Sequence, residues 1–454
     1  MRELKIGSSS VRGVVGDDLT PELIVDFACA FGTWVEGGAV LVGLDPRRSS
    51  TMLRAATLSG LVSQGCEVID FGLCPTPFLS FAARELGTGG AISITGSHND
   101  GRWNALKFIG PDGALLNEVK SEELLDIYHA SAFLRGIEPR PVTESCPDGI
   151  VRRYLEHLLS ALDVEAIRSC AFNVAVDFCN GACAPLASLF LEQLGCTLLP
   201  LNDRPCSEFA HPPTPSVDNM RQLVRFVRRC DVDLGAALNV DGDRVAFVTG
   251  SGDPLSEELT LPLAAVCRLA RRPGSIVTNF STSRRVDAIA EEYGERVIRT
   301  AVGEGRVMER GIEEAAVLAG EGSGGVAALP TSMTFDGLLT LAMVLEAMAR
   351  ERCTPAEMVS RLPELFIRKG TLRCSTDQVY RLLETYREEF ASANTDFSDG
   401  VRVEWDDAFL HVRASNTEPL LRVIVEASDK ERAETIFSDV MSKGRGIAAG
   451  SGEG

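Results

Sequence analysis

Short apolar runs alternate with longer amphipathic stretches along most of the 454 residues of this chain. The runs hold about five apolar residues, as buried strands do, and the stretches of roughly 12 to 16 residues have the spacing of helices. The first round predicts strands at 39–45, 67–72 and 91–95, and a helix that Ser49 and Ser50 cap and that ends near Gly65. A strand–helix–strand order indicates a largely parallel sheet with right-handed crossovers.

The same rhythm starts again twice further along the chain. The second round predicts strands at 173–178, 197–201 and 234–240 and a helix at 184–195. The third round predicts strands at 275–280, 296–301 and 316–322, with helices that begin near Ser283 and Glu304. Three similar rounds predict three related α/β domains with mixed, largely parallel sheets, which we place at 1–145, 146–249 and 250–362.

The last part of the chain has a different order of elements. The pattern predicts strands and helices in this order: a strand at 368–374, a helix at 377–389, strands at 401–405, 409–415 and 420–427, and a helix to about Lys443. This order indicates an α+β domain, which we place at 363–445. The glycine-rich residues 446–454 are predicted to form a flexible tail.

Charge and hydropathy restrict the partners. The formal net charge is -19, which argues against nucleic acid or an anionic membrane as a partner. No apolar run approaches the ~20 residues that cross a bilayer. The N-terminal MRELKIGSSS lacks the apolar stretch of a signal peptide. We therefore expect a cytoplasmic protein.

Cysteine and histidine spacing gives no sign of a zinc site. The thirteen cysteines are scattered, and the closest pair, Cys179 and Cys183, has no second pair at metal-site spacing. Buried free thiols are therefore expected. The histidines that follow no recognisable spacing are expected to be structural or surface residues: His129, His157, His211 and His411.

The first of four polar loops, TGSHND, follows the predicted strand at 91–95 directly. A loop in this position places the Ser97 hydroxyl at the carboxyl edge of a sheet, where α/β folds bind ligands. A serine there can act as a nucleophile once a neighbouring group activates it. A loop that only caps the next helix is the alternative, because Ser and Asn are ordinary N-cap residues.

The second loop, NVDGDR, alternates oxygen-bearing side chains at Asn239, Asp241 and Asp243. Such oxygens can converge on a hard cation such as Mg²⁺. Arg244 can hold a phosphate at the same place. The alternative is a solvated acidic turn. An EF-hand is excluded, since its twelve-residue loop with a terminal Glu is absent.

The third loop, GEGSGG, carries Glu321 and Ser323 on a glycine-rich turn after a strand. Glu321 can accept two sugar hydroxyls, and Ser323 can exchange a hydrogen bond with another. The loop fits neither the Walker pattern nor GxSxG. A turn without a ligand is the alternative.

The fourth loop, RASNTEPLLRV, collects the donors of a phosphate cradle. They are the guanidinium groups, hydroxyls and amide of Arg413, Ser415, Asn416, Thr417 and Arg422. The alternative is the polar end of a hairpin.

Together, in this order and at these separations, the four loops resemble those of the α-D-phosphohexomutase family, which includes phosphoglucomutase, phosphomannomutase and phosphoglucosamine mutase. The stretch GSSSVRGVVG is similar to the family's N-terminal motif, so the resemblance covers nearly the whole chain. It implies four domains around a central cleft, with one loop from each.

The resemblance also implies a role for each loop. Ser97 is implied to be the phosphorylated serine, with Arg12 and His98 lining its site and Lys107 as the candidate general acid/base. Asn239, Asp241 and Asp243 are implied to hold Mg²⁺ together with the phosphate on Ser97. Glu321 and Ser323 are implied to bind sugar hydroxyls. The implied binders of phosphate are Arg244, Arg413, Ser415, Asn416, Thr417 and Arg422.

The implied activity is exchange of a phosphoryl group between C1 and C6 of a hexose, through phosphoserine and a bisphosphorylated sugar. Its partner is a small-molecule phosphosugar, its cofactors are Mg²⁺ and an activating hexose 1,6-bisphosphate, and the enzyme is expected to be a monomer or homodimer. WNALKF and Gly325 are similar to the same positions in archaeal-type members, the phosphoglucosamine mutases and phosphomanno/phosphoglucomutases, and the sugar stays open.

Some positions depart from the commonest family pattern. Gly96 stands where alanine is usual, Asp100 where proline is usual, and Asn239 in place of the first of three aspartates. A non-catalytic sugar-phosphate-binding protein and a phosphatase on the same fold are therefore kept as alternatives. The intact Ser97 and Lys107 argue against the first, and a cleft with four loops would be superfluous for the second.

Overall fold

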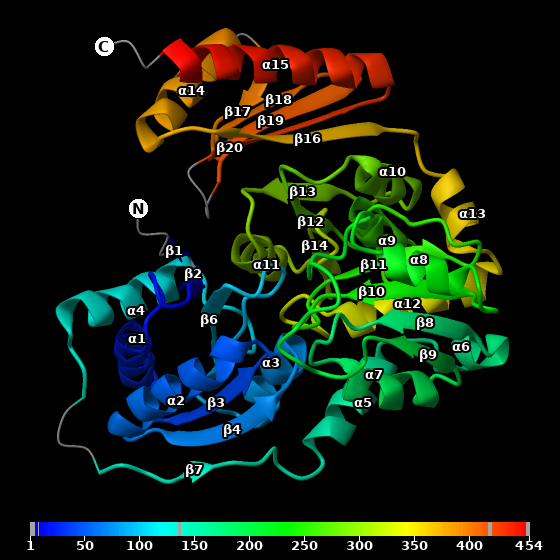
Figure 1. Ribbon diagram of the computed structural model, residues 1–454. Helices are drawn as coiled ribbons and strands as arrows, with labels where there is room; N and C mark the ends of the chain where they lie inside the picture. Colours follow the sequence, from blue (N-terminus) through cyan, green and yellow to red (C-terminus); the bar gives the residue numbers. More distant parts are fainter. Residues whose placement is uncertain (1–4, 8, 135–137, 392, 416–419, 451–454) are drawn as a thin grey trace.

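The computed structural model describes residues 5–7, 9–134, 138–391, 393–415 and 420–450. The chain forms four domains in sequence order, each built on its own sheet (Figure 1). This architecture confirms the predicted fold class. Among the described residues, no helix combines the length and the apolar character needed to cross a bilayer.

The first domain holds a mixed sheet in the order β1-β2-β6-β5-β3-β4-β7. β5 and β4 pair with β3 in parallel, whereas β6 pairs antiparallel with both β5 and β2. The strands are β1 (Lys5–Ile6), β2 (Ser10–Val14), β3 (Ala39–Leu44), β4 (Glu67–Leu73), β5 (Gly90–Ile94), β6 (Trp103–Ile109) and β7 (Val142–Thr143). The helices are α1 (Pro21–Trp34), α2 (Arg48–Ser63), α3 (Thr76–Glu85) and α4 (Glu118–Ala130).

The predicted cap of α2 is wrong. Its N-cap is Arg47, without a side-chain cap bond, so Ser49 and Ser50 lie inside the first turn. The Ser50 hydroxyl instead donates to the carboxylate of Asp45 at 3.0 Å, so it does not cap a backbone N–H of the helix. The strand β6 was not among the predicted strands, because its fully buried WNALKFI has no alternation of polar and apolar residues.

The second and third domains hold smaller sheets, in the orders β11-β10-β8-β9 and β13-β12-β14-β15. In each, three neighbouring strands are parallel and one edge strand, β11 or β15, is antiparallel. The second domain consists of α5 (Ile150–Ser160), α6 (Val164–Cys170), β8 (Asn173–Asp177), α7 (Ala184–Gln193), β9 (Thr197–Leu201), α8 (Arg221–Val227), β10 (Leu234–Leu238) and β11 (Val245–Thr249).

The third domain ends in α12, which is buried along most of its length. Its elements are η1 (Glu257–Leu259), α9 (Thr260–Arg271), β12 (Ile276–Asn279), α10 (Arg285–Glu292), β13 (Val297–Thr300), α11 (Glu304–Glu313), β14 (Leu318–Gly320), β15 (Val326–Ala328) and α12 (Gly337–Glu351). The short helix α13 (Pro355–Ser360) then leads to the fourth domain.

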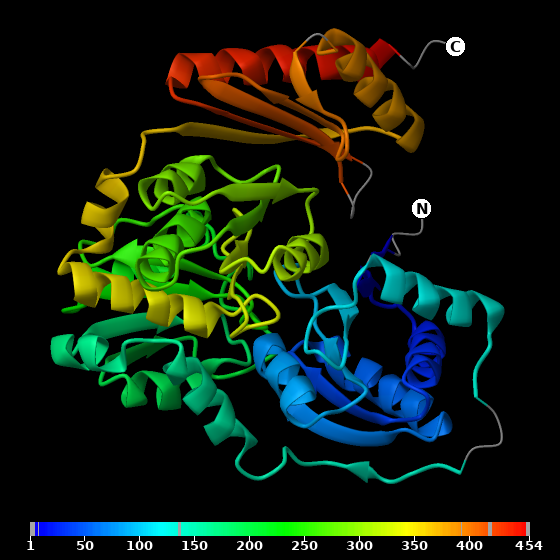
Figure 2. The ribbon, with the colours of Figure 1, turned by 180° about the vertical axis from the view of Figure 1, so that it is seen from behind.

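The fourth domain is an antiparallel sheet in the order β16-β20-β19-β18-β17, covered by two helices (Figure 2). Its elements are β16 (Phe366–Arg373), α14 (Thr376–Glu389), β17 (Asn394–Asp396), β18 (Val401–Glu404), β19 (Ala408–Ala414), β20 (Leu420–Ala427) and α15 (Lys430–Gly450).

The prediction that the last helix ends at about Lys443 is wrong. The helix α15 continues to Gly450. A Cβ on Gly444 would lie 2.4 Å from Leu372, so the glycine lets the helix pack closely on the sheet. Ile447 packs on the core of this domain and extends the helix past the glycines.

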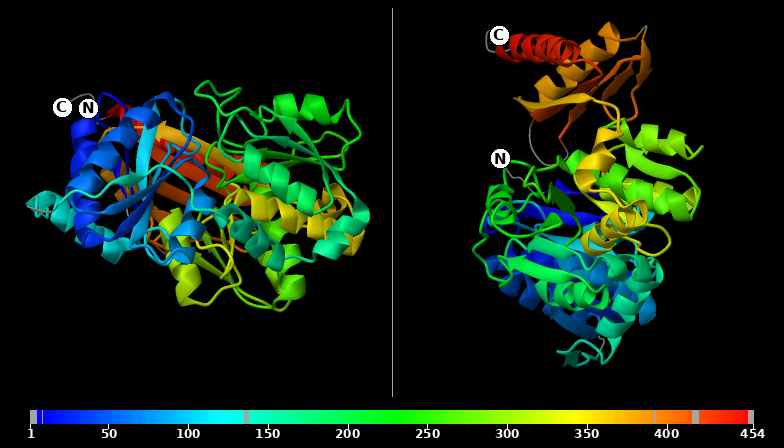
Figure 3. Two further views of the ribbon diagram at one scale, coloured as in Figure 1. Left: turned by 90° about the horizontal axis from the view of Figure 1, so that it is seen from below. Right: turned by 90° about the vertical axis from the view of Figure 1, so that its right-hand side faces the viewer.

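The cores show how the domains are joined. One continuous cluster runs from Phe78 of the first domain through Phe190 of the second to Leu345 of the third. The fourth domain has a separate core around Leu382 and Val423. Figure 3 shows the fourth domain at one end of the molecule, joined through α13. The first three domains therefore pack as one body.

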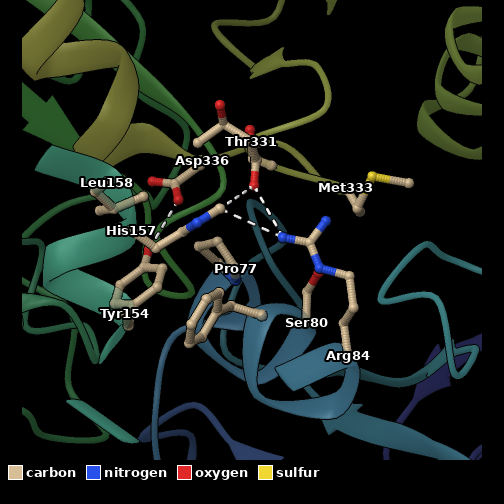
Figure 4. Close-up of a pocket in the computed structure, with 11 residues that line it drawn as sticks. Pro77, Ser80, Arg84, Tyr154, His157, Leu158, Thr331, Met333 and Asp336 are labelled. Carbon is tan, nitrogen blue, oxygen red and sulfur yellow. Dashed lines mark hydrogen bonds between the residues drawn. The ribbon is translucent and has the colours of Figure 1, made fainter. Parts of the chain in front are cut away.

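Polar contacts tie the same three domains together around a small cavity of about 10 Å³ (Figure 4). Tyr154 donates to Asp336 at 2.8 Å, and the ring of His157 meets the carbonyl of Thr331 at 2.7 Å. Arg84 of α3 also reaches His157, at 3.3 Å. A volume of this size holds at most a single water molecule, so this cavity is structural.

Candidate functional site

A cleft of about 1010 Å³ is lined by residues of all four domains. Most of the side chains singled out in the sequence line it: Arg12, Ser97, His98, Lys107, Asp243, Arg244, Glu321, Ser323, Arg413, Ser415 and Arg422. Asn239 and Asp241 are buried behind this lining. Asn416 and Thr417 lie outside the described residues.

Ser97 lies on the loop that leaves the carboxyl end of β5, at the edge of the sheet where a ligand site is expected. Its backbone is left-handed, with φ of 49°. Its Oγ lies 3.3 Å and 3.4 Å from the two carboxylate oxygens of Asp243, and Asn239 Nδ2 donates to it at 3.2 Å. The structure therefore brings the first two polar loops together across a domain boundary.

β6, which pairs with β5, and β2, which pairs with β6, carry the cations. β6 pairs with β5 so that Lys107 lies opposite Ser93, and β2 pairs with β6 so that Arg12 lies opposite Ala105. Lys107 Nζ donates to Asp243 at 2.6 Å and to Asp241 at 3.1 Å. Burial disfavours the ammonium, but these carboxylates outweigh it and raise the Lys107 pKa.

The second loop is the turn between the antiparallel strands β10 and β11. Gly242 makes the turn possible, because its φ is 72° and a Cβ would lie 2.1 Å from Cys183 Sγ. Burial and the charge of Asp243 raise the pKa of Asp241, whereas Lys107 and Arg244 outweigh burial and lower the pKa of Asp243. Of these two buried carboxylates, the firmly ionised Asp243 contacts Ser97, and Asp241 shares Lys107 and Asn239 with it.

Asn239 is arranged differently from the expected ligand oxygen. Its Nδ2 donates to Asp241 at 2.8 Å and to Asp243 at 2.6 Å. Its Oδ1 accepts the backbone N–H of Arg244 at 3.1 Å. The amide thus presents its NH₂ group, rather than its oxygen, to the two carboxylates.

Positive charge surrounds Ser97 on the cleft side. Within the described part of the chain, His98 Nδ1 and Arg244 Nε are buried without a hydrogen-bond partner. Arg244, burial and Arg12 lower the pKa of His98 well below its usual value, so the ring is neutral. Arg244 Nε lies 3.7 Å from Asp243 Oδ1 without a hydrogen bond, so its N–H can donate to an anion in the cleft.

The third loop places a carboxylate on the opposite wall of the cleft. Glu321 Oε1 accepts from Asn279 Nδ2 at 2.8 Å and from the N–H of Gly303 at 3.0 Å. Ser323 Oγ donates to Glu321 Oε2 at 3.4 Å. One carboxylate oxygen is therefore anchored to the protein, and the other faces a hydroxyl at the cleft.

The fourth domain contributes paired arginines. Arg413 and Arg422 are direct neighbours across β19 and β20. Arg413 Nε donates to Asp399 at 3.2 Å, and Asp399 also accepts the backbone N–H of Val302 at 2.8 Å. Asp399 thus links this arginine to the third domain.

Several cleft residues were missed by the sequence reasoning. Asn99 accepts from Arg12 Nη1 at 2.9 Å. Glu304, at the start of α11, lies 3.9 Å from Lys107, and burial raises its pKa to about 7. Lys369 of β16 reaches Glu258 at 2.7 Å. The position of Asn99 two residues after Ser97 could have identified it from the sequence. The pairs Glu304–Lys107 and Lys369–Glu258 join segments far apart in the sequence, so no local motif predicts them.

The sequence matches the phosphoglucomutase/phosphomannomutase family over all four parts of its length. The alpha/beta/alpha domains I, II and III match residues 3–135, 152–252 and 259–366, and the C-terminal domain matches residues 382–443.

Relatives and solved structures agree with this match. A probable phosphoglucosamine mutase of Methanopyrus kandleri is 34% identical over 448 residues, covering 96% of this chain and 97% of the relative. A phosphoglucomutase/phosphomannomutase of Thermococcus kodakarensis is 32% identical and covers 94% of this chain and 95% of its own. The crystal structure of a phosphoglucomutase/phosphomannomutase family protein from Burkholderia thailandensis superposes with a TM-score of 0.83 at 28% identity, over 96% and 97% of the two chains.

Proposed function

Because this chain belongs to the phosphoglucomutase/phosphomannomutase family, we propose that it interconverts hexose 1-phosphate and 6-phosphate through a phosphoserine at Ser97. The chain is a phosphohexomutase, and hence an isomerase. The observation that carries the proposed mechanism is the place of Ser97 Oγ, 3.3 Å from Asp243 in a cleft lined by all four domains.

In the forward step, the bond from phosphorus to Ser97 Oγ breaks as a bond from phosphorus to a sugar hydroxyl oxygen forms. The proton lost by that hydroxyl is balanced by one gained at Ser97 Oγ, and we assign its delivery to Lys107. Asp241 and Asp243 hold the ammonium in place but also raise its pKa, so Lys107 is a weak proton donor while both carboxylates stay ionised. The bisphosphorylated sugar then turns over in the cleft, and its other phosphate returns to Ser97 Oγ by the reverse exchange.

A divalent cation fits the acidic side of this site. Asp241 and Asp243 would hold Mg²⁺ together with the phosphate on Ser97, because buried carboxylates are the ligands that this ion prefers. When bound, the ion neutralises charge on the transferring phosphoryl group. Asn239 fits this role less well, since its NH₂ group faces the carboxylates.

The remaining loops would bind the rest of the substrate. Glu321 and Ser323 are proposed to read sugar hydroxyls, and Arg413, Ser415 and Arg422 to hold the phosphate that is not being transferred. The 34% identity to a probable phosphoglucosamine mutase favours glucosamine phosphate, with mannose and glucose phosphates as the next candidates. A hexose 1,6-bisphosphate would charge Ser97 initially and act as activator.

The test combines an assay with mass analysis. The protein is incubated with Mg²⁺, a hexose 1,6-bisphosphate, and the 1-phosphates of glucosamine, glucose, mannose and N-acetylglucosamine in turn. We expect isomerisation of at least one sugar, a single phosphate on the intact protein, and the loss of both in Ser97→Ala. Ser63→Ala, on α2 away from the cleft, is the control. A folded Ser97→Ala protein with full mutase activity would refute the mechanism.

A further inference from the structure

The backbone of Ser97 is held in a conformation that serine seldom adopts. A φ of 49° is left-handed, a region that brings the Cβ close to the following carbonyl oxygen and is unfavourable for a residue other than glycine. Such a conformation persists only where the surroundings enforce it. The hydrogen bonds that hold Ser97 in this conformation come from side chains behind the loop, which do not line the cleft.

The Arg47 side chain is fully buried beneath this loop and uses every donor that it has. Its Nη2 donates to the carbonyls of Ser97 and Asn99, both at 2.7 Å. Its Nη1 donates to the carbonyls of Trp103, at 3.2 Å, and Asp100. Its Nε donates to the carboxylate of Asp45. A guanidinium has five N–H donors in a fixed plane, so this fan of carbonyls is matched by arginine alone.

Asp45 is the carboxylate that orders both ends of Ser97. It accepts from Arg47 Nε at 2.9 Å and from Thr95 Oγ1 at 2.7 Å. Thr95 Oγ1 in turn accepts the backbone N–H of Ser97 at 2.9 Å. The N–H of Ser97 is thus fixed through Thr95 and its C=O through Arg47, and a single buried carboxylate aligns the two.

Two further contacts close the space around Arg47. A Cβ on Gly96 would lie 2.7 Å from Arg47 Cζ, so the glycine allows the guanidinium to approach the loop. The ring of Phe209, from the second domain, lies over the guanidinium with its centroid 5.0 Å from Cζ. The guanidinium therefore has no room to leave the loop without moving another domain.

We propose that Asp45, Arg47 and Thr95 form a positioning cradle that fixes the Ser97 backbone in its left-handed conformation and so aims Oγ for phosphoryl transfer. This inference rests on the proposed role of Ser97. None of the three residues touches the reacting atoms. The cradle acts through the direction in which Ser97 Oγ points.

The experiment measures the single-turnover rate at which Ser97 gains phosphate from a hexose 1,6-bisphosphate, by intact mass after rapid quench. Arg47→Lys keeps the charge but offers three donors, and Thr95→Val keeps the shape but removes the hydroxyl. We expect each to slow transfer on the order of tenfold to a hundredfold, since small misplacement of a reacting group has effects of that size. The KM for hexose 1-phosphate should stay within about twofold, because uniform substrate binding is intact.

Matched variants separate positioning from folding. Thr95→Ser restores the hydroxyl and should recover most of the rate. Arg54→Lys changes a partly exposed arginine on α2, the helix that Arg47 precedes, and should leave the rate unchanged. Circular dichroism identifies variants that fail to fold, and Thr95→Val, nearly the shape of threonine, provides the test if Arg47→Lys does not fold. Folded Arg47→Lys or Thr95→Val proteins with the wild-type transfer rate would overturn the cradle while the proposed function stands. A wild-type enzyme that never phosphorylates Ser97 would overturn the proposed function itself.

Discussion

The ammonium of Lys107 lies 2.6 Å from the carboxylate of Asp243, and both side chains are almost fully buried. The pair joins β6 of the first domain to the β10–β11 turn of the second. Asp241 shares the same ammonium at 3.1 Å. Lys107 therefore neutralises the acidic turn as well as facing the cleft.

Lys107→Met should remove both activity and stability. The substitution leaves two carboxylates buried without their cation, and breaking such a pair costs about 3–5 kcal/mol. We expect a loss of that size in the free energy of unfolding, measured in urea, together with loss of mutase activity. Lys120→Met breaks an exposed pair with Asp112 and should change stability by less than about 1 kcal/mol. Equal stabilities of the two variants would contradict the structural role.

Glu321→Gln should weaken use of every accepted sugar. The change removes the charge that accepts from Asn279, Gly303 and Ser323, and an unpaired group in such a site costs ~1–3 kcal/mol. We expect kcat/KM to fall by roughly tenfold to a hundredfold in the mutase assay. Glu313→Gln, exposed on α11, is the control. Normal kcat/KM in Glu321→Gln would remove this loop from sugar recognition.

The order of strands and helices was largely predictable, because runs such as AVLVGL and the central VAV of NVAVD are apolar, as central strands of a covered parallel sheet are. The pattern was weakest where tertiary contacts decide the outcome. β6 carries Lys107 in a fully buried strand, a residue that periodicity alone does not place there. The predicted end of the last helix was wrong, because packing of Gly444 on Leu372 overrides the low helix propensity of glycine.

Many of the cleft-lining residues were predicted from the polar loops that follow strands, because such loops lie at the carboxyl edge of a sheet, where ligands bind. The side chains behind those loops were out of reach of the same reasoning. Arg47 stands fifty residues before Ser97, and only the fold shows that its donors meet the carbonyls of this loop. The direction of the Asn239 amide also depends on a partner, the N–H of Arg244, that the motif does not reveal.

The His211–Asp177 pair should make part of the stability depend on pH. Burial lowers the pKa of His211, but its bonds to Asp177, at 3.1 Å, and to Cys179 outweigh burial and raise the pKa to about 11. A folded pKa above the unfolded value of about 6.5 means that the pair's contribution is complete below pH ~6.5 and is lost as the pH rises toward 11. The stability difference between wild type and His211→Asn should therefore shrink from pH 6 to pH 10.

The same pair anchors a loop near Ser97. Thr214, three residues after His211, donates to the carbonyl of His98 at 3.1 Å. Hydrogen exchange at this loop should be faster in His211→Asn than in wild type at pH 6. Urea unfolding of both proteins at several pH values gives the stability difference. A difference that grows with pH would contradict the charged pair.

Asn239→Asp should make stability depend on Mg²⁺. The NH₂ group of Asn239 donates to Asp241 and Asp243 at 2.8 Å and 2.6 Å, and a third carboxylate would replace these bonds by repulsion. Without divalent cation, we expect the free energy of unfolding to fall by about 2–4 kcal/mol. If Asp241 and Asp243 hold Mg²⁺ as proposed, binding to the folded state should restore much of that loss, so the rise in Tm with Mg²⁺ should exceed that of wild type. Asn239→Leu loses the same bonds without adding charge and should show the lower Tm without the larger Mg²⁺ response. Equal Mg²⁺ responses in wild type and Asn239→Asp would mean that position 239 does not face the cation.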